Sequence, residues 1–480
     1  MNMRWRLASL GSGRVLVGLL LALASMQLHA QAGPITTQTL FFDQATSARQ
    51  GNYLDAQGGF IYTDNVDFSR DPKSDVLAMI GLVGDTARQG APRLDYHLDT
   101  NIAVVKYFSN TYDIQPFGYL DAGGEFKIVP GFFSWDARDT YSQAVLNPFA
   151  AATPDNVESL NYATTGPRFT IKPTLQDTLT LTGFYGRVDT NSKSPNYINI
   201  DSDRYGGDAR LDHAFSSNVT VYVTYDYGDV TYIDKVNNSD FTSQVIAGGL
   251  RLHNFRTTFD GSIGYTKLRL NTDDPAIEDK NPKGVNWRFE LGRLISPTQR
   301  VTLHASKQNT DAANLFLISL DQPVPSNQNN RIVPGQPFVH TEYGGTWHVD
   351  GIRNTLDVGL MSSSDRYEVT PQDNRDARSI NALYQRHLTP LWVWNIGGSY
   401  EDDHYTTGDV HTITFLTTLR WTIGQRVAVR FLYARSELGP HGVAANEIGV
   451  TATYALTRAA LATDPARDLH PTSPASQPRL

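Results

Sequence analysis

The chain has 480 residues, of which 40% are hydrophobic, 11% aromatic and 19% charged, and its formal net charge is −8. It contains no Cys, which excludes disulfide frameworks, thiolate metal sites and a Cys nucleophile. The acidic balance argues against a nucleic-acid binder, because such proteins normally carry a basic patch. A mean hydropathy of −0.35 together with 23 Tyr and 21 Phe is unusual for a soluble enzyme of this size.

Residues 1–30 have the three parts of a secretory signal peptide. Three Arg residues within the first 14 positions form a positive start, residues 15–24 are apolar, and the segment ends on the small residue Ala30. The apolar stretch is too short for a membrane anchor helix, which needs about 20 residues. We therefore predict export of the chain and cleavage after residue 30.

Apolar and polar residues alternate with a period of two through most of the remaining chain, which predicts strands. In residues 218–227, three Val and two Tyr alternate with two Thr, Tyr222 and Asp226. Segments 391–401 and 411–421 repeat the pattern. The alternating segments run for about 9–14 residues, which exceeds the usual soluble strand and suits a tilted membrane crossing.

Connection lengths and aromatic residues separate a membrane barrel from a soluble sandwich. Short connections cover 213–218, 296–299, 349–354, 388–391 and 423–426, and longer polar ones cover 64–74, 141–158, 190–202, 270–284, 310–335 and 367–376. Aromatic residues gather near segment ends, at Tyr225, Tyr227, Trp287, Trp347, Trp392, Trp394, Trp421, Tyr433 and Tyr454. Short turns that alternate with long loops, and aromatic girdles, are typical of outer-membrane barrels.

The pattern predicts an all-β fold: a transmembrane, antiparallel, up-and-down β-barrel of about 20 strands. Counts of 16 and 18 lie within the error of strand boundaries. The predicted organisation is a signal peptide at 1–30, a short periplasmic segment at 31–51, the barrel at 52–456 and a flexible periplasmic tail at 457–480. The predicted location is the outer membrane of a Gram-negative cell.

The most specific motif lies between residues 147 and 167. It reads Asn147-Pro148-Phe149-Ala150, Thr153-Pro154-Asp155-Asn156, Asn161-Tyr162 and Gly166-Pro167, and it follows the aromatic segment Phe132-Phe133-Ser134-Trp135. Turn-forming Pro and Asn residues predict a rigid cap. The series resembles a family of bacterial outer-membrane β-barrels associated with exopolysaccharide and PEP-CTERM gene clusters. This resemblance implies a location and a gene context, and it assigns no functional residue.

Charged residues on the polar face of the strands are the candidate functional group. They are Asp208, Arg210, Asp212, Arg251, Asp260, Arg288, Glu290, Asp357, Arg420 and Arg430. Opposed acidic and basic side chains in a water-filled barrel select among solutes, so we predict that these ten line the lumen. The alternative is a set of ion pairs that satisfy one another inside a filled barrel. Tyr222 is expected to face inward, where its ring could stack on a sugar.

The connection 310–335 is the candidate constriction. Its apolar run, Leu315-Phe316-Leu317-Ile318, favours burial, and the barrel interior offers it. The alternative is a loop that protrudes from the barrel.

Two further clusters contain residue types that occur in catalytic and metal sites. Glu401-Asp402-Asp403-His404 pairs carboxylates with a His, but neighbouring residues on a strand point to opposite faces, so the four are not expected to converge. His340, Glu342 and His348 share a face, although His348 lies about 20–25 Å from His340 along a strand. No catalytic, cofactor or metal site is predicted.

The leading hypothesis is a porin-like barrel that provides a solute route and serves exopolysaccharide export. Its rivals are a closed structural or assembly barrel without conductance, and an enzyme with an active site at the rim, which we disfavour. The expected partners are outer-membrane lipid and lipopolysaccharide, with polysaccharide or its export machinery as a further candidate and no nucleic acid. The sequence does not specify the solute, gating or oligomeric state.

Overall fold

The computed structural model describes residues 53–147, 149–151, 153–191, 199–235, 238–271, 283–315, 336–439 and 443–456. These residues form one 20-stranded antiparallel sheet. Its strands are β1 (Tyr53–Thr63), β2 (Asp75–Arg88), β3 (Leu94–Tyr107), β4 (Gln115–Val129), β5 (Phe133–Val145), β6 (Val157–Ile171), β7 (Asp177–Asn191), β8 (Ser202–Ser216), β9 (Val219–Tyr232), β10 (Asp240–His253), β11 (Thr257–Asn271), β12 (Lys283–Ser296), β13 (Gln299–Thr310), β14 (Phe338–Asp350), β15 (Asn354–Tyr367), β16 (Arg375–Thr389), β17 (Trp392–Tyr405), β18 (Gly408–Ile423), β19 (Val427–Leu438) and β20 (Val443–Ala455). Two 3-10 turns, η1 (Pro154–Asn156) and η3 (Pro371–Asp373), lie in the connections β5–β6 and β15–β16.

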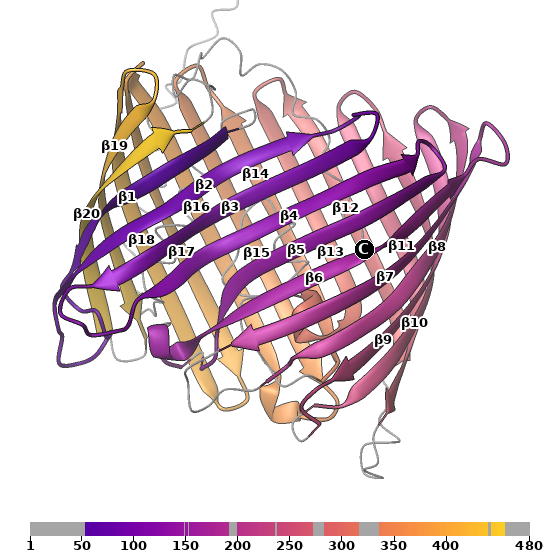
Figure 1. The fold of residues 1–480 in the computed structure, drawn as a ribbon, viewed down its shortest axis with the longest axis horizontal. Coiled ribbons are helices and arrows are strands. Elements are labelled where there is room, and N and C mark those ends of the chain that lie inside the picture. Colours follow the sequence, from indigo (N-terminus) through magenta and orange to yellow (C-terminus); the bar gives the residue numbers. More distant parts are fainter. Residues whose placement is uncertain are drawn as a thin grey trace, which may run out of the picture.

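The sheet closes on itself because each strand pairs with its neighbours in chain order and the first strand pairs with the last (Figure 1). The closing pairs of β1 and β20 run from Asp55↔Ala455 to Thr63↔Glu447. Closure leaves the sheet no open edge, which is what a sheet requires in hydrocarbon, where unpaired backbone groups find no water. The predicted up-and-down barrel and its count of 20 strands are confirmed.

The register divides the strand residues into an outer and an inner set, because directly opposed residues share a face of the sheet. The outer set carries large exposed hydrophobic side chains, such as Phe60, Ile80 and Leu360. The predicted girdle residues belong to the same set, and the rings of Trp392 and Trp421 stack at 5.4 Å. The outer surface is therefore apolar and bordered by aromatic residues, as a lipid-facing surface is.

The two ends of the barrel differ in the length of their connections. One end holds the short turns, such as 217–218 and 297–298, together with the start of β1 and the end of β20. The other end holds most of the long connections, which lie along the lower edge of Figure 1. In outer-membrane barrels the short turns face the periplasm and the long loops face outward, so we refer to the long-connection end as the external end.

The strands run from residue 53 to residue 455, inside the predicted barrel segment 52–456. The predicted signal peptide 1–30, periplasmic segment 31–51 and tail 457–480 lie outside the described residues and stay predictions.

Among the described residues, no helix is long and apolar enough to cross a membrane.

Leu360 and Met361 offer a direct test of the two faces. Leu360 is an outer residue at the middle of β15 and is 58% exposed, whereas Met361 beside it is an inner residue. We expect Leu360→Arg to lower the free energy of unfolding by about 2–4 kcal/mol, the cost of Arg at the bilayer midplane. Met361→Arg should lower it by less than about 1 kcal/mol. Urea unfolding in lipid vesicles measures both, and equal losses would contradict the assignment of the faces.

Candidate functional site

Three ion pairs follow one another along the inner face of β8 to β12. They are Arg210 Nη2–Asp212 Oδ1 at 2.9 Å, Arg251 Nε–Asp260 Oδ2 at 3.1 Å and Arg288 Nη2–Glu290 Oε2 at 3.6 Å. Their side chains are partly exposed, from 21% for Asp212 to 51% for Arg288. We call these six residues the charged wall.

Tyr222 lies within the charged wall and points inward, as the alternation predicts. Its hydroxyl donates to Asp260 Oδ1 at 2.6 Å, and the Arg210 guanidinium lies 3.8 Å from the centre of its ring. Arg210 therefore covers one face of the ring, the ring lies close to Gly249, and Tyr222 is only 7% exposed, so it offers no free face on which a sugar could stack.

All ten sequence candidates belong to the inner set, but they do not form one cluster. Asp357 lies away from the charged wall and contacts His348, with Nδ1 and Oδ1 2.6 Å apart. Arg420 is directly opposite Arg430 across β18 and β19. Asp208 is directly opposite Asp226 across β8 and β9, beside the charged wall. The assignment of the ten residues to a solute route stays a prediction.

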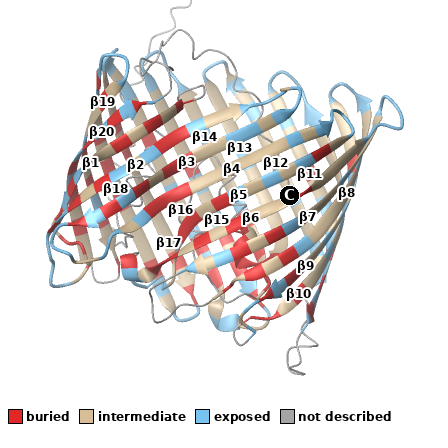
Figure 2. Ribbon diagram, in the orientation of Figure 1, coloured by how far each residue is buried: buried red, intermediate tan, exposed pale blue. Residues whose placement is uncertain are grey.

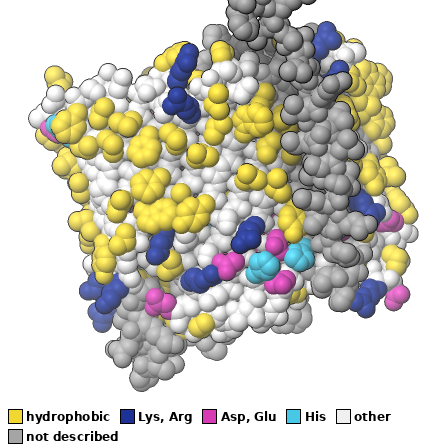
Figure 3. Space-filling view, turned by 180° about the vertical axis from the view of Figure 1, so that it is seen from behind, with side chains coloured by type: hydrophobic (Ala, Val, Ile, Leu, Met, Phe, Trp, Pro, Cys, Tyr) yellow, Lys and Arg dark blue, Asp and Glu magenta, His cyan; other side chains and the backbone are white. Residues whose placement is uncertain are grey.

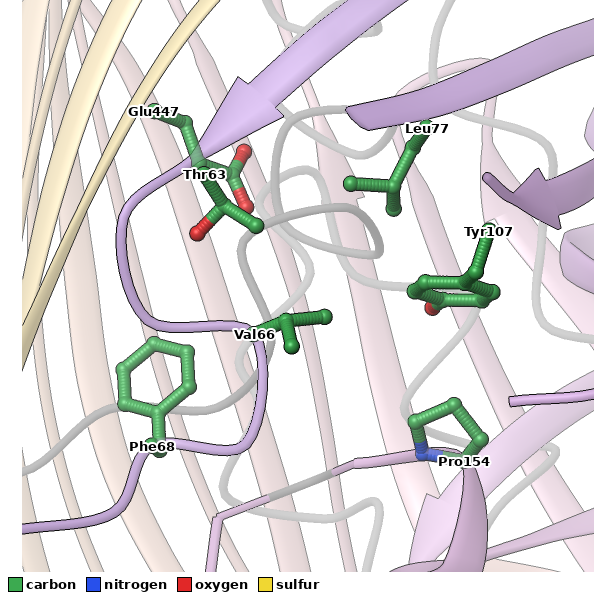
Figure 4. Close-up of a pocket in the computed structure, with 7 residues that line it drawn as sticks. All are labelled: Thr63, Val66, Phe68, Leu77, Tyr107, Pro154 and Glu447. Carbon is green, nitrogen blue, oxygen red and sulfur yellow. The ribbon is translucent and has the colours of Figure 1, made fainter. Parts of the chain in front are cut away.

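The inner surface of β1 to β4 is apolar towards the external end, where it is covered by a connection that folds into the barrel. Connection 64–74 contributes Val66, which packs with a cluster of Ile61, Leu77, Met79, Ala103, Val105, Tyr107, Phe117 and Leu432. Its Phe68 packs with Ala151, Leu416, Ala434 and Ala445. Figure 4 shows Val66, Leu77, Tyr107 and Pro154 around a small cavity. The external end is therefore filled on this side, and Figure 2 shows buried residues both here and on β6 to β9.

Tyr112 joins three connections at this end. It lies in connection 108–114, and its ring packs edge-on against Tyr107 at a centroid distance of 5.2 Å. The pKa of Tyr112 is raised to about 12, mainly by burial and secondly by the charge of Asp67 in connection 64–74. A hydrogen bond with Thr153 acts in the opposite direction. The three connections thus form one packed layer.

The Asn-Pro motif forms a compact cap with Asn156 at its centre. Asn156 Nδ2 donates to the carbonyl oxygens of Asn147, Ala150 and Ala151 at 2.9, 3.1 and 2.8 Å. Its Oδ1 accepts a hydrogen bond from the Asn147 N–H at 2.8 Å. The side chain replaces backbone partners across the connection, which is how Asn stabilises such turns. The expected rigid cap has this physical basis.

The connection after β13 enters the barrel through an ion pair that the sequence did not reveal. Asp311 accepts two hydrogen bonds from Arg204 of β8, at 3.1 and 2.6 Å, and one from the Tyr232 hydroxyl at 3.2 Å. Arg204 and Asp311 are only 2% and 1% exposed. A bidentate Arg–carboxylate contact fixes geometry as well as charge, so it anchors this connection to the inner wall five strands away.

The described start of the predicted constriction lies inside the barrel. One helical turn covers 312–315, and its Ala312 and Ala313 pack into an apolar cluster that includes Leu268 and Leu270 of β11. Leu315 packs with Phe338 and Tyr367. Burial of this start is what the constriction hypothesis expects. The rest of the apolar run, from residue 316, and the connection to residue 335 lie outside the described residues.

A chain of ionisable side chains crosses the inner face of five neighbouring strands, β13 to β17. Its contacts are His304–Glu342 at 3.0 Å, Glu342–His340 at 3.6 Å, His340–Asp365 at 2.7 Å, Asp365–Arg375 at 3.9 Å, Arg375–Asp403 at 2.9 Å and Arg375–Glu401 at 3.4 Å. Most of these side chains are buried. The partners come from five segments that are distant in sequence, so no local motif could reveal the chain.

Residues 401–404 are divided between the two faces of the sheet, and His340 and Glu342 already contact each other. Glu401 and Asp403 point inward to Arg375, whereas His404 on the outer face contacts Asp402 at 3.1 Å. The four residues therefore do not converge, as strand geometry predicts. The described residues contain no group of three or more His, Cys, Asp or Glu placed to hold a metal ion.

The closed ring, the apolar outer surface and the polar inner wall together define an integral β-barrel of the cell outer membrane. No protein-family model matches the chain, and no curated protein matches it.

Among solved structures, the chain is similar to the ferric citrate transporter FecA (8% identity, 85% of this chain and 79% of that one, TM-score 0.44). It is also similar to the FrpB iron transporter of Neisseria meningitidis (7%, 87% and 83%, TM-score 0.46) and to OccAB2 of Acinetobacter baumannii (10%, 85% and 98%, TM-score 0.34). At these TM-scores the similarities carry no argument about function.

A double-mutant cycle tests the Arg204–Asp311 anchor. Arg204→Met should lower the free energy of unfolding by about 3–5 kcal/mol, because it leaves a buried carboxylate without its cation. Combining it with Asp311→Leu should recover much of that loss, since no charge then remains buried. Urea unfolding in vesicles provides the four values, and additive losses would show that the two residues are not coupled.

The packed connections should loosen at high pH. The unfolded chain loses the Tyr112 proton near pH 10 and the folded chain near pH 12, so the folded state binds more protons between these values and its stability falls as the pH rises through them. Comparison with Tyr112→Phe, in unfolding experiments from pH 9 to pH 12, isolates this contribution. The variant should lose less stability than the parent over that interval, and parallel curves would contradict the prediction.

Proposed function

We propose that this protein provides a route for small hydrophilic solutes across the outer membrane, along the charged wall of β8 to β12. The observation that carries the proposal is the exposure of the inner ion pairs. Arg251 and Asp260 are 29% and 41% exposed, and Arg288 and Glu290 more so. Charged inner side chains that remain exposed support a water-filled lumen on this side, and a barrel of about 20 strands is wide enough to contain water.

Weak charge selection is expected along such a route. The ten inner candidates comprise five Arg and five carboxylates, and the charged wall itself alternates in sign. Alternating charges produce a transverse field that orients polar solutes and excludes neither sign strongly. The substrate class that we propose is therefore small, polar and without a required net charge.

A closed structural barrel is the second candidate, and the packing of the external end favours it. Connection 64–74 and the start of the β13–β14 connection are both buried against the inner wall. If these segments meet in the middle of the lumen, the barrel conducts nothing. The charged wall would then contain ion pairs that satisfy one another.

A narrower version of the proposal is that the solute is an exopolysaccharide. Its support is the resemblance of residues 147–167 to the exopolysaccharide-associated family. Deletion of the protein should then reduce surface polysaccharide, and an unchanged amount would contradict this narrower version.

Single-channel recording in planar bilayers tests the solute route. The parent should give steady conductance, and replacement of Arg251 and Arg288 by Gln should shift the reversal potential in a salt gradient towards cation selectivity, because the carboxylates of the wall then lack their cations. The matched control is Arg366→Gln/Arg435→Gln, which removes two cations from the outer set. It should leave the reversal potential unchanged.

Two results would overturn the route. If folded barrels insert many times without any conductance, the closed structural barrel is supported instead. An unchanged reversal potential in the Arg251→Gln/Arg288→Gln variant would show that ions pass elsewhere.

A further inference from the structure

Charged side chains border the outer surface near the external end, below the hydrophobic band in Figure 3. Several of them are neutralised by a neighbour on the same face. The pairs include Arg187–Asp189 at 2.9 Å, Arg366–Asp376 at 2.6 Å, His404–Asp409 at 2.8 Å and Arg435–Glu437 at 2.5 Å. This border is therefore largely a row of ion pairs.

Strands β11 to β13 differ, because their external ends carry four outer cations. Lys267 and Arg269 lie near the end of β11, Lys283 is the first residue of β12, and Lys307 lies near the end of β13. None of the four forms an ion pair with a carboxylate among the residues that the structure describes. We call these residues the basic patch.

The register places like charges directly against each other within the basic patch. Lys267 is directly opposite Lys283, so their Cβ atoms are about 4.5–5.5 Å apart on the same face. Like charges at this separation destabilise a sheet, and both side chains are exposed. An anion bound between them would turn this repulsion into two favourable contacts.

The surface beneath the basic patch is apolar and aromatic. Tyr265 and Val285 are directly opposite each other and 47% and 53% exposed. Trp287 is directly opposite Lys307, and its ring lies 5.8 Å from that of Tyr343. The ligand therefore needs anionic groups at the level of the external border and acyl chains alongside the barrel.

We propose that the basic patch binds the phosphate groups of lipopolysaccharide in the outer leaflet. The Lys and Arg side chains contact the phosphates directly, without a bridging divalent cation, while the acyl chains lie on the aromatic surface of β11 to β14. Lipopolysaccharide combines phosphate and acyl chains in one molecule, which matches four outer cations beside an apolar and aromatic surface. The site is independent of the solute route, because it lies on the opposite face of the sheet.

Retention of lipopolysaccharide by the full-length barrel tests the proposal. The protein is extracted from outer membranes in mild detergent, and the bound lipopolysaccharide is counted by native mass spectrometry. The test variant is Lys267→Gln/Arg269→Gln/Lys283→Gln. The matched control is Arg187→Gln/Arg366→Gln/Arg435→Gln, which makes the same change of charge at the same end among cations that already have partners.

We expect the test variant to bind purified lipopolysaccharide about tenfold more weakly than the parent, the combined effect of three partly solvated ion pairs. The control should retain parental affinity. Lipopolysaccharide stripped of its phosphates should bind the parent and the test variant equally, and EDTA should not displace the intact ligand from the parent.

Equal retention by the test variant and the parent would overturn the proposal, and so would release by EDTA, which would indicate a bridging cation. Heat-dependent migration in gels confirms that each variant is folded. If the triple variant does not fold, Lys283→Glu replaces it. This single change also removes a cation from the patch and should weaken binding, whereas unchanged binding would again refute the site.

Discussion

The structure depends on one constraint: a backbone in hydrocarbon must satisfy all its hydrogen bonds within the protein. Twenty antiparallel strands meet it because the last strand returns to the first, with Phe60 opposite Val450 in the closing seam. Closure assigns each strand residue either to the lipid-facing surface or to the interior. It also allows a chain of negative mean hydropathy to reside in a membrane, since only alternate residues must be apolar.

The inner wall of the barrel is not uniform, and the proposed function depends on this difference between its parts. Towards the external end the inner wall of β1 to β4 is apolar, and connection 64–74 covers it. The wall of β8 to β12 carries exposed ion pairs, whereas the external ends of β9 to β11 pack in an apolar cluster with residues 312–313. At the external end of β8, Arg204 holds the beginning of another connection inside the barrel through Asp311. Exposed charges of the inner wall therefore lie on β8 to β12, which is where we propose the solute route.

The period-two alternation that produces the strands also places charged residues that are adjacent in sequence on opposite faces of the sheet. Adjacent residues such as Asp403 and His404 separate to opposite faces, so a sequence cluster of carboxylates and His becomes two ion-pair systems. On the outer face the same sorting leaves Lys267 against Lys283. Both results follow from a period of two and a fixed register rather than from any local motif.

The sequence alone determined the class of fold, a count of about 20 strands, the face of each candidate residue and the positions of five of the short turns. It could do so because alternation, turn residues and aromatic ends are local properties of the chain. Tertiary structure alone decided which inner residues meet. Arg204 and Asp311 are 107 positions apart, and the partners of Arg375 come from β15 and β17. Such contacts depend on the curvature of the closed sheet and on the inward path of the connections, and neither leaves a periodic signal in the sequence.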